Sequence, residues 1–184
     1  MSDLIRAAIG LFAVMATLGA GTTLASLASD QLPARRRLLA VAALLAFAGL
    51  AVVAAVSSEI LEWLAVSPEN FQLAAGLVML PLAFRLLWAG SVWPPQLAST
   101  TWRVWSLLSG PVPAVLVLSY SARFGFETAL GAAAIALAAS ATILLAGAWF
   151  AGRFGAVQEM LGRFNGVLII ALAIELMLDG VQSV

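Results

Sequence analysis

Two short stretches of this chain combine helix-interrupting residues with hydroxyl groups inside otherwise apolar sequence. Residues 109–113 read Ser-Gly-Pro-Val-Pro, and residues 19–23 read Gly-Ala-Gly-Thr-Thr. Proline has no backbone N–H and glycine destabilises a helix, so both stretches should free backbone donors and acceptors. Within lipid, such groups need partners from protein, water or a bound ligand. We therefore interpret the two stretches as a pair of helix breaks that line a binding site.

The chemistry that such breaks favour is binding of a small zwitterion. A helix amino terminus presents N–H groups and a positive dipole end, which suit a carboxylate, whereas exposed carbonyl groups suit an ammonium group. The candidate substrate-binding residues are Gly19, Gly21, Thr22, Thr23, Ser109, Gly110, Pro111 and Pro113. The competing interpretation is structural, because small residues let helices pack closely and serine or threonine can bond its own helix backbone.

Among the charged residues within predicted apolar spans, Arg85 and Glu175 are the candidates, because charged side chains there are functional candidates by default. Arg85 is close to a span end, so its guanidinium can reach the interface. Glu175 lies deeper. It is a candidate for carrying a coupling proton, or for an interfacial or helix-packing carboxylate near Arg6 or Arg123.

The composition is that of an integral membrane protein, with 63% hydrophobic residues, 10% charged residues and a mean hydropathy of +1.06 over 184 residues. All nine basic residues are arginine and nine acidic residues balance them, so nothing indicates a nucleic-acid partner. The chain contains no cysteine and no histidine, which excludes thiol chemistry, imidazole catalysis and Cys/His metal sites. We expect no metal and no cofactor.

The apolar runs predict an all-α membrane protein with six transmembrane helices in one domain, residues 1–184. The run nearest the start is long enough to span, so we expect a first span rather than a cleaved signal. Turn signals separate the runs, among them Ser67-Pro68-Glu69-Asn70, Arg123-Phe124-Gly125 and Gly162-Arg163. Residues 57–65 are expected to prolong the second helix, with Glu59 and Glu62 facing water. The predicted spans are residues 5–27, 38–56, 71–88, 104–120, 128–150 and 165–181.

An offset of ninety residues relates the two halves. Gly76 corresponds to Gly166 and Gly90 to Gly180, and the break at 19–23 corresponds to the break at 109–113. Each half, residues 1–92 and 93–184, contains three predicted spans. Because three is odd, the second half must enter the membrane from the opposite side. We therefore expect two inverted-topology three-helix repeats with interrupted helices 1 and 4.

The arginines predict the orientation, since short cytoplasmic loops accumulate them. The loops after the first, third and fifth spans carry six arginines, whereas the other side carries two. Both termini are therefore expected outside the cytoplasm. The six are Arg35, Arg36, Arg37, Arg103, Arg153 and Arg163, and the two are Arg6 and Arg123.

Three segments carry a resemblance to a known family. Residues 163–181, with Arg163-Phe164-Asn165-Gly166 and Asp179-Gly180-Val181, are similar to the final helix of the MarC family. Residues 71–87 resemble its third helix, and residues 107–111 resemble its Gly-Pro element in the fourth. Where that family has Asn-Pro in the first helix, this chain has Gly19-Ala20-Gly21.

The resemblance implies a six-span protein of the bacterial inner membrane, related to transporters of small neutral amino acids and more distantly to LysE-type exporters. We expect a transporter or exporter of such amino acids or related metabolites, with the lipid bilayer and a small-molecule substrate as partners. A homo-oligomer or a membrane-complex partner is left open. The alternative is a structural or accessory membrane subunit that transports nothing. No paired aspartates or Ser/His set indicate an intramembrane enzyme, so none is expected.

Overall fold

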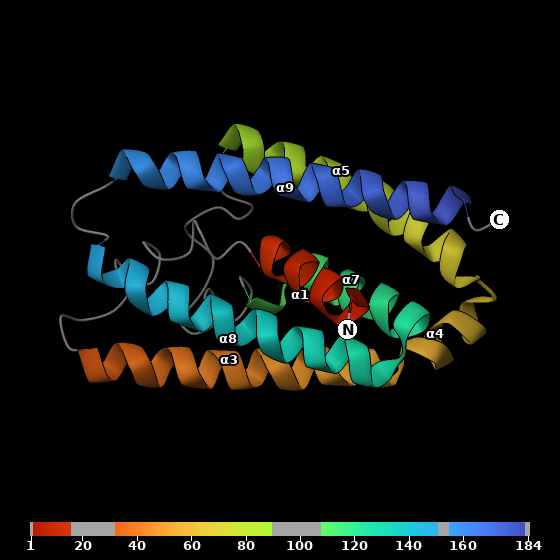
Figure 1. Ribbon diagram of the computed structural model, residues 1–184, viewed down its shortest axis with the longest axis horizontal. Coiled ribbons are helices and arrows are strands. Elements are labelled where there is room, and N and C mark those ends of the chain that lie inside the picture. Colours follow the sequence, from red (N-terminus) through yellow and green to blue (C-terminus); the bar gives the residue numbers. More distant parts are fainter. Residues whose placement is uncertain (1, 16–31, 90–107, 151–154, 183–184) are drawn as a thin grey trace.

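The computed structural model describes residues 2–15, 32–89, 108–150 and 155–182, and in these ranges all regular structure is α-helix, with no strand. Figure 1 shows α3, α5, α8 and α9 running along the long axis of the molecule, with the shorter α1 and α7 beside them. The helices are α1 (Ser2–Val14), α3 (Leu32–Ala55), α4 (Ser57–Leu64), α5 (Pro68–Ala89), α7 (Pro111–Phe124), α8 (Phe126–Phe150) and α9 (Gly155–Gln182).

Two helices contain stretches long and apolar enough to cross a membrane. These are Phe126–Leu144 in α8 and Arg163–Gln182 in α9. The bent pair Leu39–Ala55 and Ser57–Leu64 qualifies as a third stretch if it is taken as one span, and α7 adds a shorter apolar helix, Val112–Phe124. By length and composition, the described residues therefore form an all-helical membrane protein with two or three candidate spans.

Residues 57–64 are helical, but the expectation that they prolong the second helix is wrong. α3 ends at Ala55, and α4 leaves it at an angle of 46°. The Oγ of Ser57 donates to the Ala54 carbonyl at 2.8 Å, and the Oγ of Ser121 in α7 donates to the same carbonyl at 2.9 Å. In a continuous helix the Ala54 carbonyl would accept a backbone N–H from the following turn. At the bend it accepts the two serine hydroxyls instead.

The expected interruption at Gly162-Arg163 is also wrong, because both residues lie inside α9, which begins at Gly155. An isolated glycine costs a helix only about 1 kcal/mol, and arginine is a good helix former. The neighbouring turn signals are confirmed. Gly125 separates α7 from α8 with φ of 88°, a conformation that glycine adopts without a steric penalty. At the start of α5, the Asn70 N–H donates to Ser67 Oγ at 3.3 Å.

The closest helix pair is α5 and α9, which pack antiparallel through small residues. A Cβ added at Gly76 would lie 2.6 Å from the Ala173 carbonyl oxygen, and one at Gly166 would lie 3.1 Å from the Ala83 carbonyl oxygen. A Cβ at Gly180 would lie 2.7 Å from the Glu69 carbonyl oxygen. These contacts recur every seven residues along both helices, the spacing of coiled-coil packing with small residues at the interface.

A second group of helices packs around α8, which contacts α1, α3 and α7. The side of α8 that faces them is rich in alanine, including the fully buried Ala129 and Ala132, so the neighbouring backbones approach closely. Large apolar side chains point away from this core, among them Ile9, Leu44 and Leu178, each more than half exposed. An apolar exterior is what a lipid environment favours.

Candidate functional site

The backbone is interrupted at Gly110, within the stretch that the sequence predicts to break. Leu108 and Ser109 are helical, Gly110 has an extended backbone with φ of −60° and ψ of 178°, and α7 begins at Pro111. The Ala114 N–H donates to the Gly110 carbonyl at 3.2 Å, which closes the first turn of the new helix. Gly110 is half-buried and Pro113 is buried, so the new helix start lies within the protein.

The two prolines limit the hydrogen bonds that this helix end can donate. Pro111 and Pro113 occupy the first and third positions of α7 and have no N–H, so among these three positions only Val112 carries a backbone donor. A carboxylate placed here would be held chiefly by the helix dipole and a nearby hydroxyl, with fewer backbone hydrogen bonds than an ordinary helix start provides.

The other expected break, with Gly19, Gly21, Thr22 and Thr23, lies outside the described residues. Near it, α1 ends at Val14, and the Met15 N–H donates to the Leu11 carbonyl at 3.0 Å.

A buried hydroxyl lies beside this end of α1. Ser140 Oγ is 3.7 Å from the Met15 sulfur, and both residues are fully buried. Thr142, by contrast, is exposed and bonds its own backbone at Ala138. Sequence reasoning did not select Ser140. The signal that could have found it is a hydroxyl in the middle of an alanine-rich span.

Two further buried polar atoms have no hydrogen-bond partner among the described residues, Ser119 Oγ in α7 and Asn165 Nδ2 in α9. Buried polar atoms are usually paired, so an unpaired one marks a place where a water or ligand can bind. Within the described part of the chain, no group of three or more Asp or Glu residues could hold a metal ion.

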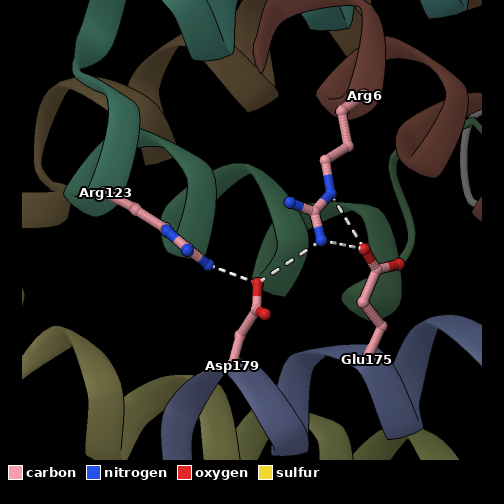
Figure 2. Close-up of polar contacts among 4 residues, drawn as sticks. All are labelled: Arg6, Arg123, Glu175 and Asp179. Carbon is pink, nitrogen blue, oxygen red and sulfur yellow. Dashed lines mark hydrogen bonds and ion pairs between the residues drawn. The ribbon is translucent and has the colours of Figure 1, made fainter. Parts of the chain in front are cut away.

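The two charged candidates have different surroundings. Glu175 pairs with Arg6, one of the two arginines that the sequence suggested for it, and Arg85 is exposed on α5. Arg123, the other suggested arginine, pairs instead with Asp179 (Figure 2). Sequence reasoning missed the role of Asp179. The signal was its position four residues after Glu175, which places both carboxylates on one face of α9.

A hollow in the described residues has none of these candidates in its lining. It has a volume of about 410 Å³ and is formed at the corner between α4 and α5. Its only charged lining residue is Glu62, and no residue of the Gly110 interruption contributes to it. One carboxylate without a cation nearby does not suit a zwitterion, so this hollow is a weaker candidate than the interruption.

The sequence of this chain also matches a known protein family. A model described as "MarC family integral membrane protein" matches residues 1–97, just over half of the 184 residues. The matched region contains α1, α3, α4 and α5. No curated protein and no solved structure matches the chain.

Proposed function

Because this chain belongs to the MarC family of integral membrane proteins, we propose that it carries small neutral amino acids or related metabolites across the bacterial inner membrane. The substrate binds between two repeats, at the breaks of helices 1 and 4. The observation that carries this proposal is the interruption at Gly110, where a helix begins inside an apolar protein. A partly buried helix start attracts a carboxylate, and its unpaired backbone groups are costly in lipid unless something binds there.

The contacts between α5 and α9 support the proposed inverted repeat, residues 1–92 and 93–184. Adding ninety to Gly76 gives Gly166, and subtracting ninety from Ala173 gives Ala83. The contact of Gly76 with Ala173 thus becomes the contact of Gly166 with Ala83. A two-fold axis between antiparallel helices produces this reciprocity, and an inverted repeat places such an axis in the membrane plane.

We further propose six spans in a single domain with both termini outside. Figure 1 shows α4 and the C-terminus towards one end of the molecule and the start of α3 towards the other. Glu59 lies in α4, and Glu69 and Glu127 lie at the starts of α5 and α8, whereas Arg37 lies near the start of α3 and Arg163 in the first half of α9. An arginine-rich end is expected to face the cytoplasm.

The proposed carrier is not an enzyme and needs no cofactor, because alternating access requires binding groups and movement rather than a chemical step. Its partners are the bilayer and the substrate, with a second copy or a membrane-complex partner still open.

Counterflow in proteoliposomes tests the function directly. Vesicles loaded with unlabelled alanine should accumulate radiolabelled alanine transiently above empty vesicles, and glycine should compete. A bulky neutral amino acid such as tryptophan should compete poorly, because the residues around both breaks are small.

The contradicting outcome is no accumulation across a panel of neutral amino acids, measured at either sign of the membrane potential. It would favour the alternative, a structural or accessory membrane subunit.

A further inference from the structure

Four charged side chains from three helices meet near the C-terminal end of α9 (Figure 2). Arg6 lies near the start of α1, and Arg123 lies in the last turn of α7. Glu175 and Asp179 lie one turn apart near the end of α9. We call these four residues the ion-pair cluster.

The ion-pair cluster is continuous, because Asp179 is shared between both arginines. Arg6 Nε donates to Glu175 Oε1 at 2.9 Å, and a second Arg6 nitrogen lies 3.8 Å from Asp179 Oδ2. Arg123 contacts that same Asp179 oxygen. Two positive and two negative charges therefore join α1 and α7, the described first helix of each proposed repeat, to α9.

Beneath the ion-pair cluster the packing is tight. Tyr120 is 8% exposed, and its hydroxyl lies where a Cβ on Gly10 would be only 2.5 Å away, so α1 and α7 meet closely. The Arg123 guanidinium lies 5.2 Å from the centre of the Phe124 ring. The space left among these side chains is about 10 Å³. That volume is near the minimum for a single water, so an amino acid does not fit between these side chains.

The ion-pair cluster has no counterpart in the other repeat. The positions ninety residues away are Gln96 for Arg6 and Pro33 for Arg123. Glu175 corresponds to Arg85, and Asp179 corresponds to Ala89. No carboxylate occurs among these four residues, so this set of ion pairs has no equivalent at the positions ninety residues away.

We propose that the ion-pair cluster is the gate at the end of the transport path that carries the N-terminus, and that it is closed in this structure. This proposal rests on the proposed function, because a gate requires a path. In an inverted-repeat carrier the repeats must separate at each end in turn. Separation at this end breaks the ion pairs of the cluster. The ion-pair cluster therefore disfavours opening at this end.

Thiol labelling tests the gate without requiring transport, since the chain contains no cysteine. A single Ser109→Cys substitution places a thiol beside the interruption, and a membrane-impermeant maleimide is added from the side that carries the N-terminus. Glu175→Gln and Arg6→Gln should each raise the labelling rate about three- to fivefold, as expected for loss of a half-exposed ion pair. The double variant should label no faster than the faster single variant, because both changes break the same pair.

The matched control is Glu127→Gln, an exposed carboxylate at the start of α8 and outside the ion-pair cluster, which should leave the rate unchanged. If Glu175→Gln lowers the yield of monodisperse protein, Asp179→Asn provides the same test, because Asp179 contacts both arginines. Unchanged labelling, or single effects that simply multiply in the double variant, would overturn the gate even if counterflow is intact. Labelling as expected without counterflow would show that the ion-pair cluster controls access to residue 109, and it would reject small neutral amino acids as the substrate.

Discussion

Replacing Pro111 and Pro113 together with alanine should lower the initial rate of counterflow by about tenfold or more, with membrane insertion intact. Each proline costs about 3 kcal/mol inside a helix, so alanine at both positions lets one helix run through Gly110 into α7. The backbone N–H groups of the two new alanines would donate to carbonyl groups one helical turn earlier. The helix start at Gly110, with its positive dipole end, would then no longer exist. A partly buried dipole end contributes up to about 2 kcal/mol to anion binding, which corresponds to a loss of up to about thirtyfold.

The matched control for this experiment is Pro81→Ala. Pro81 is exposed inside α5, where the helix continues on both sides, so its replacement should change counterflow little. Rates are compared at equal amounts of reconstituted protein, with insertion checked by protease accessibility. If the double-proline variant transports at the unaltered rate, the interruption is a packing kink and not a binding site.

A Gly76→Leu substitution should destabilise the protein by about 3 kcal/mol or more, the upper end of the usual range for overpacking. Even the first added carbon would lie 2.6 Å from the Ala173 carbonyl oxygen, which is backbone and cannot rotate away. The α5–α9 pair would have to separate along its length. The free energy of unfolding can be measured by titration with a denaturing detergent.

Two further glycine variants serve as controls for Gly76→Leu. Gly49→Leu should be tolerated, since a Cβ at Gly49 in α3 would meet nothing within 4 Å. Gly166→Ala should be intermediate, because its nearest backbone neighbour, the Leu87 nitrogen, is 3.0 Å away. Equal stability of Gly76→Leu and Gly49→Leu would contradict the close packing of α5 on α9.

The helical class and the interruption at Gly110 could be predicted because their signals are local. Apolar runs too long for soluble helices indicate spans, and proline blocks a helix wherever it lacks the N–H that the helix needs. The turn at Gly125 is equally local, since a positive φ favours glycine. The six-span count and the inverted repeat stay predictions.

The bend between α3 and α4 could not be predicted, because its stabilising partner comes from far along the chain. Ser121 donates to the Ala54 carbonyl only after α7 packs against this corner. The continuation of α9 through Gly162 was missed for a related reason. A single glycine is a weak signal, and tertiary packing decides whether the helix ends there.

For the candidate site, sequence reasoning selected the backbone element and one ion-pair partner but not the whole arrangement. Glu175 was paired with Arg6 or Arg123 in advance, because a carboxylate within a span needs a cation and only those arginines lie on its side. Asp179 contacts both arginines. Predicting those contacts requires knowing how α1, α7 and α9 are each rotated about their own axes. The rotation of a helix about its axis depends on how its side chains pack against other helices. That packing cannot be deduced from a single sequence.

The central claim, that a small neutral amino acid binds at the Gly110 interruption, is tested most directly by substrate protection of the Ser109→Cys variant. A membrane-permeant maleimide reaches the thiol from either side, so the state of the gate does not limit the reaction. Saturating alanine should slow labelling at this position by about tenfold, since a site that is nine-tenths occupied reacts only in its empty fraction. A Leu178→Cys control on the exposed face of α9 should label at the same rate with and without alanine. Equal labelling of a Ser109→Cys variant that retains counterflow, in the presence and absence of alanine, glycine and serine, would contradict the claim.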